Sequence, residues 1–190
     1  MKKNSIVTSN LKYLKKVLPL IRIQVYSSDI TLIADKNLLK NILFFLKNSI
    51  LCQFNLITCI SGVDYPTNTF RFNIVYDLLS LKYNSRIRIK VYTHELLPVP
   101  SSIDIFPASN WFESEIWDMF GIFFTKHPNL KRLLTDYGFN GYPLRKDFPV
   151  SGFVEMRFNE DLKRVFSESI EFSQEYRTFH FVSPWQSFRN

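Results

Sequence analysis

The sequence predicts an α+β domain in two layers, followed by a loop-rich region and an extended C-terminal tail. Apolar residues recur at helical spacing over residues 11–18 and 38–50, whereas over residues 54–93 they alternate with polar residues as strands do. The order of elements is then αββαβββ, and helices packed on a mixed, largely antiparallel sheet satisfy both periods with short connections. The expected boundaries are residues 1–108 for the α+β domain, 109–150 for the loop-rich region and 151–190 for the tail.

The N-terminal elements follow from spacing and turn chemistry. The first helix is expected over residues 11–18 and ends at Pro19, which cannot continue it. Residues 21–25 alternate apolar and polar side chains, a Ser-Ser-Asp turn follows, and residues 31–33 complete a predicted hairpin. The second and longer helix has Asp35 as its candidate N-cap.

Three strands are expected next, over residues 54–62, 70–79 and 86–93. Turn-forming clusters separate them, as expected for antiparallel neighbours. In the last strand Arg86, Arg88 and Lys90 alternate with apolar residues, which indicates a strand with one face in water.

Residues 109–148 hold two of the three tryptophans and three of the five glycines, more specialised residues than a generic core segment needs. Asn110 and Glu113 have the spacing of a capping box at the start of a helix, and Gly121 is its expected C-cap. A further short helix is expected to begin at Pro128, because proline suits the first helical position.

The tail, residues 151–190, shows few regular signals apart from short strands expected near residues 154–158 and 164–171. It is nevertheless rich in aromatic residues, which are costly to expose to water. We therefore expect the tail to lie on its own domain or on another subunit. The aromatic residues are Phe166, Phe172, Tyr176, Phe179, Phe181, Trp185 and Phe188.

The formal net charge of +7 resides in the N-terminal part of the chain. Residues 1–50 contain nine Lys and Arg against two acidic residues, whereas the remainder is balanced. This excess fits a solvated face, contact with anionic lipid, an acidic partner or nucleic acid. No stretch is long and apolar enough for a membrane span, so we expect membrane association only through partners. The N-terminus resembles neither a secretory signal nor a mitochondrial presequence, which favours an organelle-encoded protein.

Cofactor-binding motifs are absent from the sequence. Neither GxGxxG nor GxxxxGK[ST] occurs, so binding of NADH, flavin or ATP by this chain is not expected. The two cysteines are too few for an iron-sulfur cluster. The three histidines are too scattered to suggest a metal site. We expect the chain to bind no cofactor.

Three carboxylates and one histidine in residues 109–148 are candidates for general acid/base chemistry. Glu115 and Asp118 are neighbours on a helix, and Glu113 precedes them. Acidic residues near a helix start are also favoured by the helix dipole, and no nucleophile lies near His127 in the sequence. The structural interpretation is therefore preferred, and no catalytic residue is expected.

The segment from Trp111 to Pro149 carries a long and specific pattern that includes WDMFG, HPNLKRLLTDYGFNGYP and LRKDFP. In this pattern the chain closely resembles the 30 kDa subunit family of respiratory complex I, the subunit 9 proteins of mitochondrial NADH:ubiquinone oxidoreductase. The resemblance continues through Ser183-Pro184-Trp185 in the tail. Two departures are Ser114, where the family usually has Arg, and Tyr142, where it usually has His. The loss of a guanidinium puts an interface role at position 114 in doubt.

The resemblance implies a non-catalytic structural subunit of the quinone module, in the matrix arm of the mitochondrial inner-membrane complex. The implied partners are the subunit with the terminal iron-sulfur cluster and the large quinone-site subunit. FMN and the iron-sulfur clusters would lie on other subunits. The signature residues implied to form the subunit interface are Glu113, Glu115, Asp118, His127, Arg132, Asp136, Tyr137, Arg145, Lys146, Asp147 and Trp185.

Two alternatives remain beside this hypothesis. One is the equivalent subunit of a plastid or bacterial relative of complex I. The other is a basic RNA-binding module, which would need exposed aromatics on strands such as Phe70 and Phe72 but lacks an RNA-recognition submotif.

Overall fold

The structure is a computed structural model that describes residues 13–26, 29–177 and 179. The chain forms two compact units, Met1–Phe148 and Pro149–Asn190. The first unit holds the sheet, the helices and the segment 109–148.

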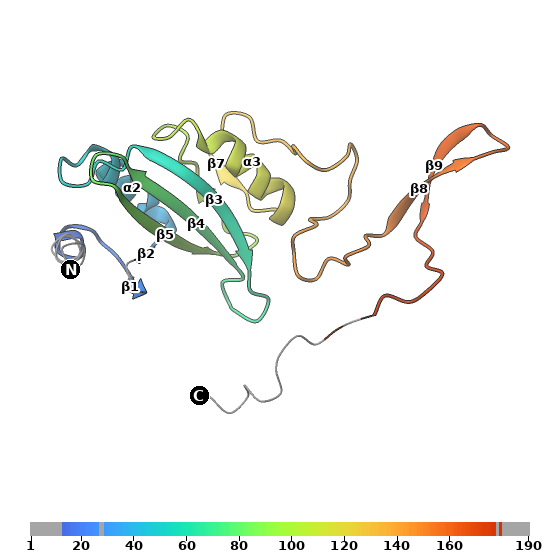
Figure 1. The fold of residues 1–190 in the computed structure, drawn as a ribbon, viewed down its shortest axis with the longest axis horizontal. Helices are drawn as coiled ribbons and strands as arrows, with labels where there is room; N and C mark the ends of the chain where they lie inside the picture. Colours follow the sequence, from blue (N-terminus) through green and yellow to red (C-terminus); the bar gives the residue numbers. More distant parts are fainter. Residues whose placement is uncertain (1–12, 27–28, 178, 180–190) are drawn as a thin grey trace, which may run out of the picture. The chain divides into compact units, whose positions relative to one another are not determined.

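A five-stranded sheet is the framework of the first unit (Figure 1). The strands are β1 (Arg22–Tyr26), β2 (Asp29–Ala34), β3 (Leu56–Asp64), β4 (Phe72–Ser80) and β5 (Ser85–Thr93), in the order β1-β2-β5-β4-β3. In this sheet β2 and β5 pair in parallel, and the other neighbouring strands pair antiparallel. The predicted mixed, largely antiparallel sheet is therefore confirmed. The expected hairpin and three strands are present, with boundaries shifted by about two residues at most.

The helices are a helical stretch over residues 13–17, a 3₁₀ turn η1 (Lys36–Leu38), α2 (Leu39–Asn48) and α3 (Ser109–Phe120). They bury one face of the sheet, as the two-layer prediction requires. The buried cluster joins side chains of that face, Leu32, Ile60, Tyr76 and Ile89, with Leu43 of α2 and Ile116 of α3.

The close approach of α3 to the sheet depends on Gly62 in β3. A Cβ atom at this position would lie 2.7 Å from the ring of Phe120 at the end of α3. The Phe120 ring also meets Phe72 of β4 edge to face at 6.3 Å. The absence of a side chain at Gly62 therefore allows α3 to pack closely against the sheet.

The expected N-caps are wrong in detail. Asp35 precedes η1 but makes no capping hydrogen bond with its side chain, which instead accepts from Asn37 at 3.3 Å. Helix α3 begins at Ser109, so Asn110 lies inside its first turn rather than capping it. Gly121 ends α3 in the left-handed conformation with φ of 74°, which confirms the expected C-cap.

The helix expected to begin at Pro128 is also absent. Among residues 126–148 there is no helix or strand, and the chain crosses this stretch in turns and bends. A short parallel pair that the sequence did not predict, β6 (Val99–Pro100) with β7 (Phe124–Thr125), flanks α3 instead.

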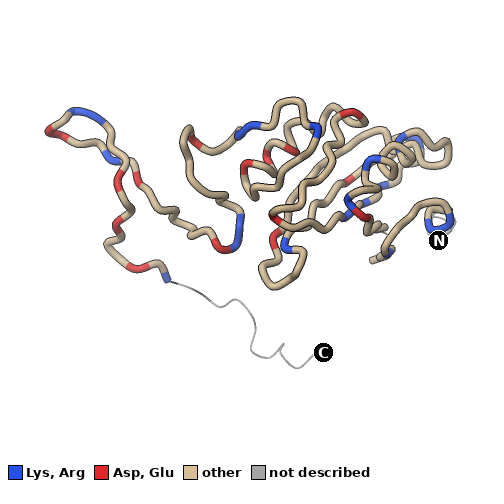
Figure 2. Tube along the Cα trace, turned by 180° about the vertical axis from the view of Figure 1, so that it is seen from behind, with Lys and Arg blue, Asp and Glu red and all other residues tan. Residues whose placement is uncertain are grey.

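The second unit contains an antiparallel hairpin of β8 (Val154–Asn159) and β9 (Arg164–Ser169). The two short strands expected in the tail are thereby confirmed. Lysines, arginines and acidic residues are spread along this hairpin (Figure 2). Trp185 and the other predictions on residues 180–190 lie outside the described residues. Within the described residues, no helix is long and apolar enough to cross a bilayer.

Candidate functional site

Glu113 ties α3 to the loop that follows β6. Its carboxylate is fully buried and accepts hydrogen bonds from the Ser101 hydroxyl at 2.6 Å, and from the Ser102 hydroxyl and backbone N–H, both at 2.7 Å. A buried carboxylate is tolerated only when it is well bonded in this way. The carboxylate is used to hold the helix, and the capping-box interpretation of Glu113 is wrong because its partners lie on another segment.

Asp118 organises the loop beyond α3. Its fully buried carboxylate accepts backbone N–H groups of Leu133 at 3.2 Å, Leu134 at 2.7 Å and Thr135 at 3.0 Å. The Thr135 hydroxyl adds a fourth bond of 2.6 Å. Burial alone raises the pKa of this carboxyl, but the bonds from Thr135, Leu134 and Leu133 outweigh it and the pKa lies below the ordinary value.

This arrangement explains why no helix forms after Pro128. Three consecutive N–H groups point at one carboxylate, as they do in an anion-binding turn. A short isolated helix is marginal in water, so four bonds to a buried charge override the local preference.

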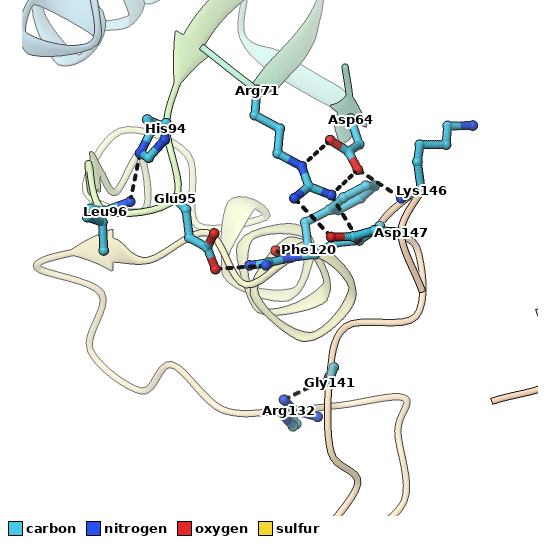
Figure 3. Close-up of polar contacts among 11 residues, drawn as sticks. Asp64, Arg71, His94, Glu95, Leu96, Phe120, Arg132, Gly141, Lys146 and Asp147 are labelled. Atoms are coloured by element: carbon cyan, nitrogen blue, oxygen red, sulfur yellow. Dashed lines mark hydrogen bonds and ion pairs between the residues drawn. The ribbon is translucent and has the colours of Figure 1, made fainter. Parts of the chain in front are cut away.

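Arg71 clamps two carboxylates that lie far apart in the sequence of the first unit (Figure 3). Its guanidinium donates to both oxygens of Asp64 at 2.7 and 2.8 Å, and to both oxygens of Asp147 at 3.1 and 2.8 Å. Asp64 also accepts the backbone N–H of Lys146 at 2.8 Å. The Arg71 guanidinium holds the pKa of each carboxyl below its usual value.

Arg145 lies between the end of α3 and the sheet. Its Nε donates to the Phe120 carbonyl and its Nη1 to Glu95, both at 2.7 Å. The guanidinium stands 4.4 Å from the centre of the Tyr142 ring and 5.3 Å from that of Phe72. Such stacking and forked donation suit arginine and not lysine.

Arg132 fixes the tip of the loop. It donates to the carbonyls of Phe139 at 2.9 Å and Gly141 at 3.1 Å, and its guanidinium stands 5.1 Å from the Tyr142 ring. Tyr142 therefore meets two guanidinium groups, Arg132 and Arg145. A neutral ring suits this place, whereas a protonated imidazole would be repelled by both cations. Ser114, the other departure from the family pattern, is buried at 3% exposure.

His127 joins the loop to the start of α3. Its Nδ1 accepts the N–H of Asn129 at 3.2 Å, so Nε2 carries the proton and donates to the Asn110 carbonyl at 3.3 Å. Both ring nitrogens are thereby used in holding the backbone, as the structural interpretation of this histidine expected.

The remaining predicted residues lie at the surface. Glu115, Asp136 and the Lys146 side chain are exposed, and Tyr137 is wholly exposed. Asp136 accepts the neighbouring N–H of Tyr137, at 2.8 Å. The same segment exposes large apolar side chains, which are Trp111, Phe123, Leu134 and Leu144.

The structure therefore brings most of the charged signature residues into one scaffold. It also adds Asp64, Arg71, Glu95, Ser101 and Ser102, which sequence reasoning missed. Arg71 is 76 positions from Asp147, and no local spacing could have joined them. Among the described residues there is no cluster of three His, Cys, Asp or Glu side chains that could hold a metal. The arrangement is suited to fixing a surface, with polar groups inside and apolar groups outside.

Comparison with known proteins gives the family. The pattern of the family described as "Respiratory-chain NADH dehydrogenase, 30 Kd subunit" matches residues 32–154. NADH-ubiquinone oxidoreductase subunit 9 of Reclinomonas americana is 55% identical over 141 residues, 74% of this chain and 69% of the relative. The C subunit of NADH-quinone oxidoreductase is 50% identical over 158 residues in Chelativorans sp., 83% of this chain and 79% of the relative. Its counterpart in Rhodospirillum rubrum is 46% identical over 166 residues, 87% of this chain and 78% of the relative. The chain therefore belongs to the family of the 30 kDa subunit of respiratory-chain NADH dehydrogenase.

Proposed function

We propose that this chain is a non-catalytic structural subunit of the quinone module of respiratory complex I. It supports electron transfer from NADH to ubiquinone by holding neighbouring subunits in register. The observation that carries the proposal is that charged residues of the family signature form hydrogen bonds within this chain. Glu113, Asp118, Arg132 and Arg145 hold the chain's own backbone and side chains in place.

The outer side of the same segment supports a docking role. Trp111 is 71% exposed, Leu134 65% and Tyr137 fully. Large apolar and aromatic side chains of this kind are enriched at protein interfaces, where they supply the buried area. Because buried carboxylates already fix this segment, little further conformational entropy of its backbone is lost when a partner binds the exposed side chains.

The hairpin of the second unit supports a docking role independently. Val154, Met156, Phe158 and Val165 share one face by register, and each is more than half exposed. The other face is polar, with Arg157 paired to Glu168 at 2.9 Å and Arg164 stacked on Phe166. An isolated two-stranded hairpin is marginally stable in water, so we expect a partner to cover this apolar face.

Other complex I subunits are the partners of such a protein. We infer that residues 109–148 and the tail lie against two of them, the subunit with the terminal iron-sulfur cluster and the large quinone-site subunit. FMN and the clusters then reside on other subunits. The subunit 9 relative supports a mitochondrial location. We propose that the chain lies on the matrix side of the inner membrane and is encoded in the organelle. The bacterial relatives are members of the same family.

The test is deletion of the gene in the source organism, followed by native electrophoresis of the membranes. We expect loss of the assembled quinone module and of NADH:quinone reductase activity, with NADH oxidation by an artificial electron acceptor retained. A fully assembled module without this polypeptide, or purified complex that lacks it, would refute the proposal. The purified chain alone should show no flavin absorbance and no NADH oxidation, because its sequence has neither GxGxxG nor GxxxxGK[ST].

A further inference from the structure

The five-stranded sheet has a second face that no helix of the described residues covers. Lys90 of β5 is in register with Ile33 of β2 and Val75 of β4, and these three alternate with side chains of the helix-covered core. We call this second face the open face and define it by six residues. They are Ile33, Val75, Asp77, Arg86, Arg88 and Lys90.

A row of three cations runs along the middle of the open face. The order of strands places β5 at the centre of the sheet, and Arg86, Arg88 and Lys90 follow one another on it at every second position. Successive side chains on one face of a strand are about 7 Å apart. Like charges at this spacing repel one another, and a partner of opposite sign relieves the repulsion.

Arg88 is the cation of this row that is neutralised within the sheet. It donates to both oxygens of Asp77 at 2.7 and 3.0 Å. Arg86 and Lys90 have no ion-pair partner within the part of the chain that the structure describes. A further carboxylate at this face, Asp29, lines a groove of about 160 Å³ together with Asp77, Arg86 and Arg88.

An apolar floor lies beneath Lys90. Ile33 is 4% exposed and Val75 8%, although neither belongs to the core under the helices. Both are the register neighbours of Lys90, which is itself half-buried. Ile33 and Val75 are therefore already buried, and the unpaired cations are what the open face offers to a bound chain.

We propose that the open face docks an acidic segment of another subunit, whose carboxylates pair with Arg86 and Lys90. The proposal rests on the proposed function, because it takes the occupant from the same complex. The two ends of this chain are not expected to bind the open face, because they carry positive and no negative side chains. Residues 1–12 contain three lysines and no acidic residue, and residues 180–190 contain Arg189 and no acidic residue.

Zero-length carbodiimide crosslinking of the intact purified complex tests the pairing, because the reagent joins an amine only to a carboxylate in contact with it. We expect mass spectrometry to find Lys90 joined to Asp or Glu of another subunit. Lys36, a lysine of η1 on the other layer that is half-buried as Lys90 is, serves as the control amine. Joining of Lys90 to this chain alone, or labelling of Lys90 by an amine reagent as readily as Lys36, would overturn the proposal.

Charge reversal gives a second, independent measurement. The variant R86E/K90E should enter the complex. In moderate salt, without crosslinker, it should dissociate on the order of tenfold faster from the subunit that crosslinking identifies. The variant K36E/K82E makes the same change of charge at one half-buried and one exposed position off the open face, as R86E/K90E does on it, and should behave as wild type. Equal release from both variants overturns the proposal, as does nucleic acid bound by the wild-type complex and lost in R86E/K90E. Absence of the wild-type chain from the complex refutes the proposed function instead.

If R86E/K90E fails to assemble, R86Q/K90Q removes the charges without adding opposite ones. Its thermal unfolding in the purified full chain shows whether the sheet is intact. An intact sheet with release unchanged from wild type also overturns the proposal.

Discussion

Arg71 and Asp147 lie 76 positions apart in the sequence, yet the guanidinium of one donates two hydrogen bonds, of 3.1 and 2.8 Å, to the carboxylate of the other. The same guanidinium holds Asp64 at the end of β3. One arginine in the turn between two strands therefore fastens the end of the signature segment to the sheet.

Substitution of Arg71 by alanine should destabilise the full chain by about 3 kcal/mol, because it leaves the fully buried Asp64 carboxylate without its cation. Urea denaturation at pH 7 measures the change. The matched control is Arg88→Ala, which removes a similar forked pair with Asp77 where both side chains are at least 30% exposed. There the expected cost is below about 1 kcal/mol. Equal losses in the two variants would contradict a special role for the buried clamp.

Asp118→Asn should loosen residues 126–148 without unfolding the sheet. An amide presents one acceptor oxygen and no charge, whereas the carboxylate receives four hydrogen bonds on its two oxygens. We expect a loss of about 2 kcal/mol and faster proteolysis within this segment. Asp136→Asn is the control, since that exposed carboxylate accepts one local N–H, and it should change stability by less than about 0.5 kcal/mol. Unchanged proteolysis in Asp118→Asn would argue against the anchoring role.

Acid should weaken the first unit through the same carboxylates. Asp64, Asp118 and Asp147 have pKa values in the folded chain below the ordinary value, so the unfolded chain takes up protons first as the pH falls. Their stabilisation is therefore complete above about pH 5 and declines as the pH passes below about 4 towards the folded-state pKa values. Urea midpoints between pH 3 and 7 should show this decline, and Arg71→Ala should flatten it. A wild-type midpoint independent of pH in this range would contradict the assignment.

Much of the first unit could be predicted from local patterns. Strand β5 alternates polar and buried apolar positions, and α2 repeats its apolar residues at helical spacing. These signals lie within a few residues of each other, so one sequence suffices to read them. The left-handed Gly121 is similarly a local requirement of the helix end.

The candidate site could not be predicted in the same way, because its partners are distant in sequence. Glu113 has the spacing of a capping residue relative to Asn110, but its hydrogen bonds go to Ser101 and Ser102 on another segment. The residues after Pro128 favour a helix locally, and Asp118 takes their N–H groups instead. In each case a buried carboxylate outweighs a local preference of less than about 1 kcal/mol per residue.

Gly62→Ala should destabilise the chain by about 1–3 kcal/mol, because the added methyl meets the Phe120 ring at 2.7 Å in a packed core. Phe120→Leu in the same chain should recover part of the loss, since a smaller side chain leaves room for the methyl. A double-mutant cycle by urea denaturation measures this coupling, which we expect to exceed about 0.5 kcal/mol. Additive losses would show that the two residues do not limit each other.

The apolar face of the hairpin in the second unit should be needed for assembly and not for folding of the first unit. Met156→Ser with Phe158→Ser removes two apolar side chains that are 66% and 52% exposed, and burying such a side chain contributes about 1.5–3 kcal/mol. We expect the doubly substituted chain to unfold in urea as wild type does but to be lost from the complex on native gels. The matched control, Glu155→Ser with Arg157→Ser, changes two side chains of the polar face and should still assemble. If both variants enter the complex equally well, the apolar face contributes nothing to docking, because the two differ only in which side of the hairpin they alter.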